Sequence, residues 1–306
     1  MAEKAAKNRP DVGGIGISNP QRVIDPASGA TKLQLAEYYL AVGEWLVPHL
    51  AKRPLSIVRA PDGVSGDSFF QRHCGRLKMP HMHVLDKSLD PEHAHLIQAD
   101  SISAVVEAVQ MGTVEFHTWN ARSDRIDKPD RVVFDLDPDP ELPWSSMVEA
   151  TNMTLELLDQ LGLKAFIKTS GGRGMHVVVP IDRRQSWGCA NEFARMVTVR
   201  LAKESPEQIV AKMGPKNRVG KIFVDYLRNQ RGASTVAAFS ARARPGLPVS
   251  VPITREELDQ ISGADQWNIL NLHERLKSLK LDPWADYATT RQSLSAQLLK
   301  DLAARQ

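Results

Sequence analysis

Two aspartates stand at the end of an apolar run near the middle of the chain, at Asp135 and Asp137 in RVVFDLDPDP. Alternate side chains of an extended strand face the same side, so both carboxylates project from one face and Phe134 and Leu136 from the other. Carboxylate oxygens in this arrangement suit Mg²⁺ or Mn²⁺, and without a cation the two charges repel each other. The pattern predicts a metal site; the alternative is a strand end with two solvated acids.

A third aspartate, Asp225, lies inside the apolar segment KIFVDYL. It is the single acid in a basic stretch that indicates a polyanion-binding surface, or else a solvated face balanced by acids elsewhere. The basic residues of this stretch are Lys212, Lys216, Arg218, Lys221, Arg228, Arg231, Arg242 and Arg244. Together with Asp135 and Asp137, Asp225 could hold two metal ions for phosphoryl transfer. The alternative is a structural ion pair of Asp225 with Arg218 or Arg228.

A glycine-rich turn follows in TSGGRGMHVVVP. Such a turn can be tight and can expose N–H groups, to which Ser170 adds a hydroxyl and Arg173 a forked cation for phosphate oxygens. His176 returns on the strand after the turn. Taken alone, the turn is a weak phosphate-binding signal, and His176 could equally be a core histidine.

The periodicity of apolar residues predicts the elements that would position these groups. Val114–Trp119 is predicted as a strand on which Glu115 and His117 face one way. Further strands are expected at Leu55–Arg59, Arg131–Asp137, Ala165–Thr169, Met175–Pro180, Ile222–Leu227 and Thr235–Ala241, the third and fourth of these forming a hairpin. Helices are expected at Thr31–Lys52, Ser101–Met111, Trp144–Leu161, Ala190–Lys203, Arg255–Ile261, Asn268–Lys280 and Thr290–Ala304, and loops over Ala60–Pro91.

The N-terminal region contains a possible phosphate site. Residues 1–20 are small and polar and are expected to form a flexible arm. Asn19, Arg22 and Lys32 surround a turn and the start of the first predicted helix. Backbone N–H groups and cations at such a place favour a phosphate.

Two features of the loop-rich stretch have competing interpretations. Phe69 and Phe70 could stack on bases or pack in the core, and because neighbouring side chains of an extended segment alternate, one is expected to be buried and one exposed. A cluster of potential zinc ligands comprises His73, Cys74, His81, His83, His93 and His95. Its spacing is not that of a tetrahedral zinc site, and the second cysteine, Cys189, is remote, so we do not predict zinc.

The composition excludes several classes of protein. The chain has 306 residues, of which 42% are hydrophobic and 25% charged, with a net charge of +3. These values are typical of a globular protein rather than a disordered, collagen-like or membrane-spanning one. No apolar export segment opens the chain, and two distant cysteines make no disulfide framework, so a cytoplasmic location is expected.

The motifs taken together resemble a known superfamily. An acidic pair on one strand, a glycine-rich hairpin from serine to histidine, and a third acid on a basic strand match the three motifs of the archaeo-eukaryotic primases. More closely, the chain resembles the polymerase module of the bacterial multifunctional ATP-dependent DNA ligases (ligase D type) of non-homologous end joining. The likeness runs through SNPQRVIDPASGATK, FDLDP, SGGRGMH, VDYLRNQRG and AFSARARPGLPVSVP.

This resemblance implies a fold and a set of site residues. The fold would be α+β, with a twisted mixed sheet of RNA-recognition-motif type, flanking helices and an N-terminal α/β part. Asp135, Asp137 and Asp225 would be the catalytic metal ligands. The nucleotide would be bound by His117, Ser170, Arg173, His176, Arg218, Arg228, Arg242 and Arg244, the DNA 5′-phosphate by Asn19, Arg22 and Lys32, and template bases by Phe69 and Phe70.

The resemblance also implies an activity and partners. The expected activity is template-assisted, metal-dependent nucleotidyl transfer with two Mn²⁺ or Mg²⁺ ions, filling gaps and extending DNA ends with NTPs or dNTPs and preferring ribonucleotides. Expected partners are broken or gapped DNA with a 5′-phosphate, an ATP-dependent ligase domain, expected in the same polypeptide, and a Ku-type end-binding protein. A nucleoid-associated location without a membrane is expected. No KxDG-type adenylation motif occurs in the sequence, so nick sealing would need that ligase.

The expected organisation is a flexible arm over 1–20 and one catalytic domain over 21–306. Within it, 21–112 would bind the 5′-phosphate and template, 113–253 would form the catalytic core, and 254–306 would be helical. Two other functions remain open from the residues. One is a non-catalytic module that binds DNA ends, for which the aspartates would be dispensable. The other is a phosphohydrolase or sugar transferase built on the DLDP motif.

Overall fold

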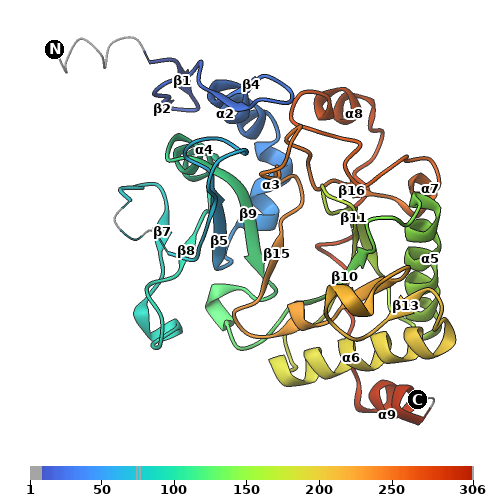
Figure 1. Cartoon of the computed structure of the whole chain (residues 1–306). Coiled ribbons are helices and arrows are strands. Elements are labelled where there is room, and N and C mark those ends of the chain that lie inside the picture. The colour runs from blue at the N-terminus through green and yellow to red at the C-terminus, as the bar shows by residue number, and fades with distance from the viewer. Residues whose placement is uncertain (1–8, 74, 76, 305–306) are drawn as a thin grey trace. The chain divides into compact units, whose positions relative to one another are not determined.

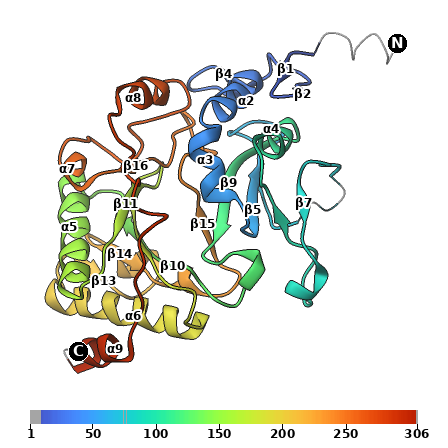
Figure 2. The ribbon, with the colours of Figure 1, turned by 180° about the vertical axis from the view of Figure 1, so that it is seen from behind.

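The computed structural model describes residues 9–73, 75 and 77–304, and the chain divides into two compact units. Unit 1 comprises the described chain up to Thr118 together with Val236–Ser250 and Trp267–Leu279. Unit 2 comprises Trp119–Thr235, Val251–Gln266 and the described chain from Lys280. Each unit is therefore built from segments that are distant in sequence. Figures 1 and 2 show the ribbon from opposite sides.

A mixed six-stranded sheet with the order β13-β14-β10-β12-β11-β16 forms the centre of unit 2. Its strands are β10 (Arg131–Pro138), β11 (Phe166–Thr169), β12 (Met175–Pro180), β13 (Ile209–Val210), β14 (Ile222–Asp225) and β16 (Pro252–Ile253). All neighbours pair antiparallel except β13 and β14. The expected hairpin of β11 and β12 is confirmed.

The two faces of this sheet differ in what they contact. Helices α5 (Trp144–Gln160) and α6 (Trp187–Glu204) cover one face (Figure 1), where Phe134 of β10 packs edge-to-face on Phe193 of α6 with ring centroids 6.3 Å apart. On the opposite face Val133 belongs to an apolar cluster with Trp284. Because side chains alternate along β10, this second face also carries its aspartates.

The sheet of unit 1 runs in the order β9-β5-β8-β7, with β6 also paired to β5. Its strands are β5 (Leu55–Arg59), β6 (Phe69–Gln71), β7 (His83–Val84), β8 (Ile97–Gln98) and β9 (Thr113–Trp119), and β15 (Ser234–Val236) adjoins β9 where the chain enters the unit. The strands expected at β5 and β9 are confirmed. The strand expected over Thr235–Ala241 is shorter, since Phe239 has a φ of 65° and turns the chain.

In the described part of unit 1, helices α2 (Lys32–Ala41), α3 (Gly43–Leu50) and α4 (Ile102–Gln110) accompany the sheet. Thr31 caps α2 in a capping box with Gln34, as its position before the helix predicted. The single helix expected over Thr31–Lys52 is broken at Val42. A Cβ on Gly43 would lie 3.0 Å from Ile102, so a glycine lets α3 pack closely on α4.

The C-terminal helices are shorter than expected. They are α7 (Arg255–Leu258), α8 (Leu272–Ser278) and α9 (Ala296–Ala304). Before α8, Asn268 Oδ1 accepts hydrogen bonds from Leu270 N and Asn271 N, a local turn that competes with helix formation. Before α9, Gln292 Nε2 donates to Lys164 O and Pro180 O, so this segment is tied to the sheet.

Small elements complete the fold. They are the strands β1 (Asp11–Val12), β2 (Ile15–Gly16), β3 (Val23–Asp25) and β4 (Ala30–Thr31), and the 3₁₀ helices η1 (Lys87–Leu89), η2 (Ser123–Arg125), η3 (Pro215–Asn217) and η4 (Leu227–Asn229). The hairpin of β1 and β2 lies within the expected arm, and Ile17 after it is fully buried. Residues 1–8 lie outside the described chain, and the division at 21, 113 and 254 stays a prediction. Within the described ranges, no helix has the length and apolar character that crossing a bilayer requires.

Candidate functional site

Four polar side chains form a row across one face of the unit 2 sheet. Asp225 of β14 is paired with Asp135 of β10, Asp135 with His176 of β12, and His176 with Lys168 of β11. His176 Nε2 lies 3.3 Å from Asp135 Oδ1. Asp137 lies two residues further along β10 and therefore shares this face. Lys168 is buried and was missed; a lysine inside the apolar strand AFIKT is the signal that indicates it.

Arg228 contacts two of the three aspartates. Its Nε lies 3.1 Å from Asp225 Oδ2 and 3.5 Å from Asp135 Oδ2. The ion pair considered as an alternative role for Asp225 is therefore present in the structure. Arg218 lies beside the third aspartate, with Nη1 3.9 Å from Asp137 Oδ2. Two of the predicted basic residues, Arg218 and Arg228, therefore lie beside the predicted aspartates.

The three carboxyl groups differ in charge. Burial raises the pKa of Asp137 to about 7, and the charges of Asp135 and Asp225 act in the same direction. Burial also raises the pKa of Asp225, against the effect of Arg228. Burial opposes ionisation of Asp135 too, but His176 and Arg228 outweigh it and lower its pKa. This face therefore carries one carboxyl group whose ionisation is favoured, that of Asp135, and two whose ionisation is disfavoured, those of Asp137 and Asp225.

The donor chemistry of this face fits a divalent cation. Three carboxylates supply oxygen ligands, which Mg²⁺ and Mn²⁺ prefer, and a cation would relieve the repulsion that raises the pKa of Asp137. Among the described residues, no group of three or more His, Cys, Asp or Glu side chains is already arranged to coordinate an ion. In this structure Arg228 contacts Asp135 and Asp225.

Asn229 fixes the segment that carries Arg228. Asn229 Nδ2 donates to Val133 O at 2.7 Å, and Asn229 Oδ1 accepts from Val133 N at 2.8 Å. From the last position of η4, the side chain therefore binds β10 as a neighbouring strand would. Leu227 N also donates to Asp225 Oδ1 at 2.8 Å. Sequence reasoning missed Asn229, because an asparagine in a basic loop carries no distinctive signal.

The glycine-rich turn is closed by its own serine. Ser170 N donates to Gly174 O at 3.0 Å, and Ser170 Oγ accepts from Gly172 N at 3.2 Å and Gly174 N at 3.1 Å. Two N–H groups that were expected to face a phosphate are therefore used inside the turn, because the serine hydroxyl reaches them. A Cβ on Gly174 would lie 2.1 Å from Leu136 O, so only glycine fits there. Arg173 is exposed in the turn.

The other predicted nucleotide contacts, His117, Arg242 and Arg244, lie in unit 1. Glu115 Oε2 is 2.7 Å from His117 Nε2 and 3.0 Å from Arg242 Nε. Glu115 and His117 thus face the same way, as predicted. The ring of His117 also meets Phe70 edge-on, with centroids 5.7 Å apart. A predicted nucleotide contact and a predicted template contact are neighbours within this unit.

Asn19, Arg22 and Lys32 come together in unit 1. Asn19 adopts a φ of 50° in the turn and its carbonyl accepts from Arg22 N at 3.0 Å, while Lys32 N donates to Arg22 O at 2.9 Å. The first N–H groups of α2 are already bonded, since Leu33 N donates to Pro20 O at 3.0 Å. A phosphate here would therefore be bound by side-chain cations rather than by the helix terminus, contrary to the expectation.

The ammonium of Lys32 is buried. It donates to Gln110 O at 2.7 Å, to Gln110 Oε1 at 2.8 Å and to Ser18 O at 3.1 Å. Burial and the charges of Arg22 and Arg9 lower the pKa of Lys32 to about 8. Arg22 Nε is buried with no hydrogen-bond partner in the part of the chain that the structure describes. Cations held close together in this way favour an anion.

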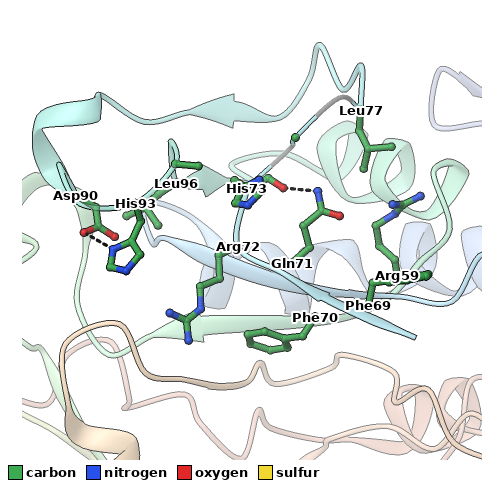
Figure 3. Close-up of a pocket in the computed structure, with 12 residues that line it drawn as sticks. Arg59, Phe69, Phe70, Gln71, Arg72, His73, Leu77, Asp90, His93 and Leu96 are labelled. Carbon is green, nitrogen blue, oxygen red and sulfur yellow. Dashed lines mark hydrogen bonds and ion pairs between the residues drawn. The ribbon is translucent and has the colours of Figure 1, made fainter. Parts of the chain in front are cut away.

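Phe69 and Phe70 line a cavity of about 730 Å³ in unit 1 (Figure 3). Basic side chains, Arg59 and Arg72, line it as well, and Arg72 lies 5.8 Å from the centre of the Phe70 ring. The expectation that one phenylalanine is buried was wrong: Phe69 is 52% and Phe70 53% exposed. β6 pairs with β5 at the periphery of the sheet, so both rings remain accessible.

The histidines near this cavity have partners other than a metal. His81 Nδ1 lies 3.1 Å from Glu107 Oε1, His93 Nδ1 lies 3.1 Å from Asp90 Oδ1, and His95 Nδ1 lies 3.0 Å from Leu85 O. Cys74 lies outside the described residues.

The fold and this arrangement of aspartates, histidine and glycine-rich hairpin define a primase-polymerase. The chain belongs to the family described as LigD, primase-polymerase domain, whose profile matches residues 31–284. The α+β fold is confirmed by similarity to the polymerase domain of Mycobacterium tuberculosis ligase D, solved in complex with DNA, with a TM-score of 0.77 and 27% identity over 86% of this chain and 94% of that one.

Longer proteins contain regions similar to this chain. The multifunctional non-homologous end joining protein LigD of Pseudomonas aeruginosa is 56% identical over 299 residues, which are 97% of this chain and 36% of that protein. The protein of the same name from Mycolicibacterium smegmatis is 29% identical over 80% of this chain and 32% of its own length. The chain therefore spans about a third of the length of these relatives.

Proposed function

We propose that the chain is a template-assisted, metal-dependent nucleotidyltransferase that fills gaps and extends DNA ends. The observation that carries this proposal is the row of Asp225, Asp135 and His176 across three neighbouring strands, with Asp137 on the same face. Convergent carboxylates of this kind can hold the metal ions that stabilise negative charge developing on phosphate oxygens. Membership of the LigD primase-polymerase family supports the same activity.

In this proposal Asp135, Asp137 and Asp225 hold two Mn²⁺ or Mg²⁺ ions. When bound, the ions would activate the primer 3′-hydroxyl and neutralise the triphosphate for in-line attack on the α-phosphate. His176 and Arg228 keep Asp135 ionised and oriented through their contacts with its two oxygens. When these aspartates hold the ions, the guanidinium of Arg228 could instead bind phosphate oxygens.

We assign the triphosphate to the glycine-rich hairpin and its surroundings. Ser170 closes the turn, and the exposed guanidinium of Arg173 can reach phosphate oxygens. His176, Arg218 and Arg228 surround the aspartates from the neighbouring strands and loops. From the family resemblance we also assign nucleotide contacts to His117, Arg242 and Arg244 of unit 1.

The remaining predicted residues are assigned to DNA. Arg22 and Lys32, with Asn19 in the turn, would bind the 5′-phosphate beyond a gap through charge-assisted contacts. Phe69 and Phe70, both exposed beside a basic cavity, would stack on template bases (Figure 3).

Two finer properties are part of the proposal. The family resemblance implies a preference for ribonucleotides, since a 2′-hydroxyl offers a further donor and acceptor to a polar pocket. Extension rates with NTPs and dNTPs under Mn²⁺ measure this, and a clear preference for dNTPs would contradict it. We also propose that the module acts in double-strand break repair with an ATP-dependent ligase and a Ku-type protein in the cytoplasm at the nucleoid, because its relatives are multifunctional end-joining proteins.

The activity is tested with a gapped duplex bearing a 5′-phosphate, labelled NTPs and Mn²⁺. The wild-type chain should add nucleotides, while Asp135→Asn and Asp225→Asn should abolish addition and keep DNA affinity. Asp127→Asn, which removes an exposed carboxylate of unit 2, is the matched control and should retain full activity. DNA binding without addition by the wild type would instead support a non-catalytic end-binding module.

A further inference from the structure

Glu115 is a buried acid that sequence reasoning assigned no role. It lies on β9 and is 5% exposed. Its two oxygens receive three donors: Oε2 lies 2.7 Å from His117 Nε2 and 3.0 Å from Arg242 Nε, and Oε1 lies 2.7 Å from Ala243 N. Burying a carboxylate is costly unless it is paired and hydrogen-bonded, and this one is both.

These donors belong to two segments of unit 1 that are distant in sequence. His117 lies on the same strand as Glu115, whereas Arg242 and Ala243 lie in a loop that starts after the bridge between Ala241 and Val249. The loop is also bonded at its far side, where Gly246 N donates to Asp25 Oδ2 at 2.9 Å. Glu115 therefore fastens the near side of the loop to β9.

The charge of Glu115 has consequences for both side chains that it contacts. Burial opposes its ionisation, but His117, Arg242 and the N–H of Ala243 lower the pKa of Glu115 to about 2. An ionised carboxylate only accepts hydrogen bonds, so Nε2 of His117 must carry a hydrogen. In the neutral ring Nδ1 is then an acceptor. Without the carboxylate, Arg242 would lose the anion that holds its guanidinium at the histidine.

We propose that Glu115 is a positioning residue for the nucleotide: it fixes the orientation and the Nε2–H tautomer of His117 and holds the guanidinium of Arg242 beside it. The inference rests on the proposed function, in which both side chains contact the nucleotide. His117 and Arg242 are 13% and 16% exposed, so each reaches the surface of unit 1 while Glu115 stays beneath them. The carboxylate thus acts through them and does not itself contact the nucleotide.

The same unit offers a matched control. Glu107 of α4 is 8% exposed, and its carboxylate also binds a histidine and a backbone N–H, with Oε1 3.1 Å from His81 Nδ1 and Oε2 2.8 Å from His81 N. Neither Glu107 nor His81 belongs to the proposed site. Glu115→Gln and Glu107→Gln each replace a buried carboxylate by an isosteric amide, so a general loss of stability should affect both alike.

The experiment compares these two variants with the wild type in steady-state nucleotide addition. Glu115→Gln should raise the KM for the nucleotide roughly tenfold to a hundredfold, the usual effect of losing a charge-assisted contact, with a smaller change in kcat. Glu107→Gln should leave both parameters near the wild-type values. Unchanged KM in a folded Glu115→Gln protein would overturn the proposal.

A second measurement does not depend on polymerase activity. ¹⁵N NMR of the histidine rings, with His117→Gln used for assignment, should show the Nε2–H form for His117 in the wild type and a mixture in Glu115→Gln. A wild-type ring that is not protonated at Nε2 would refute the positioning role. If the wild type neither binds nor adds nucleotides, the proposed function fails, whereas the tautomer alone decides the role of Glu115 toward His117.

Discussion

Asp135 and Asp225 lie directly opposite each other on the antiparallel strands β10 and β14, and the guanidinium of Arg228 contacts both. Two carboxylates at adjacent strand positions repel each other unless a cation is present. In this chain an arginine supplies that cation, whereas the basic group beside the third aspartate, Asp137, is Arg218 at a distance of 3.9 Å.

Asp137→Asn should raise the melting temperature in metal-free buffer above neutral pH. Burial and the neighbouring carboxylates raise the pKa of Asp137 to about 7, so its ionisation destabilises the folded state as the pH rises through that value. Because the side chain is 41% exposed, we expect a gain on the order of only 1 kcal/mol, or roughly 2–4 °C.

The pH dependence checks the cause. Well below a pH of about 4 the carboxyl group is protonated in both folded and unfolded chains, so the gain should vanish there. Thermal melts of wild type and variant across this range measure it, with Asp127→Asn as a surface control. A variant that melts lower than the wild type at alkaline pH would exclude repulsion as the dominant effect at Asp137.

The selectivity for a 5′-phosphate should fall as the pH rises through about 8. In the proposed pocket the phosphate would be bound by the charged ammonium of Lys32, whose pKa is lowered to about 8 by burial and by Arg22 and Arg9. Titrations at constant salt, on gaps ending in phosphate and in hydroxyl, give the ratio of the two affinities. Lys32→Met should reduce that ratio roughly tenfold to a hundredfold and remove its pH dependence near 8. Equal affinity of the wild type for both gaps would exclude an end-recognition pocket here.

Gly174→Ala should destabilise the chain and disturb the glycine-rich hairpin. The new Cβ would lie 2.1 Å from Leu136 O, so strand β10 or the turn must move, at a cost of roughly 1–3 kcal/mol. Gly188→Ala is the control, because the nearest atom to its Cβ is Ser186 Oγ at 3.8 Å and alanine favours a helix. Chemical denaturation measures both, and equal stability of the two variants would contradict the steric argument.

Phe70→Ala should weaken binding to a duplex with an unpaired template base by roughly 1–3 kcal/mol. Since Phe70 is exposed, the melting temperature should change little. Val84→Ala, another exposed apolar residue of unit 1, should leave DNA affinity unchanged. An equal loss of DNA affinity in Phe70→Ala and Val84→Ala would indicate a general surface effect rather than stacking.

Much of the unit 2 site could be predicted because side chains alternate between the two faces of a strand with a period of two residues. Alternation placed Asp135 and Asp137 on one face, and apolar runs located β10, β12 and β14. What could not be predicted is the register between strands. Only the pairing of the strands in the structure shows that Asp135, Asp225 and His176 are adjacent. The same pairing places Lys168 next to His176.

Other parts depended on tertiary packing that a local pattern does not encode. Gly43, which weakens a helix and follows the break at Val42, was passed over in the sequence, and its close approach to Ile102 of another helix is visible only in the folded chain. The exposure of both phenylalanines depends on β6 lying at the periphery of its sheet. The role proposed for Glu115 depends on the contact of its carboxylate with Arg242, which is far away in sequence.

The interleaving of the two units constrains how the chain can be synthesised and divided. The chain passes from one unit to the other after Thr118, Thr235, Ser250, Gln266 and Leu279. On the ribosome, the first unit must wait for Trp267–Leu279 and the second for residues beyond Lys280 before either is complete. Cutting the gene at one linker therefore cannot yield two autonomous halves. Nascent chains that stall before Trp267–Leu279 has been synthesised should expose the incomplete cores of both units to chaperones and proteases.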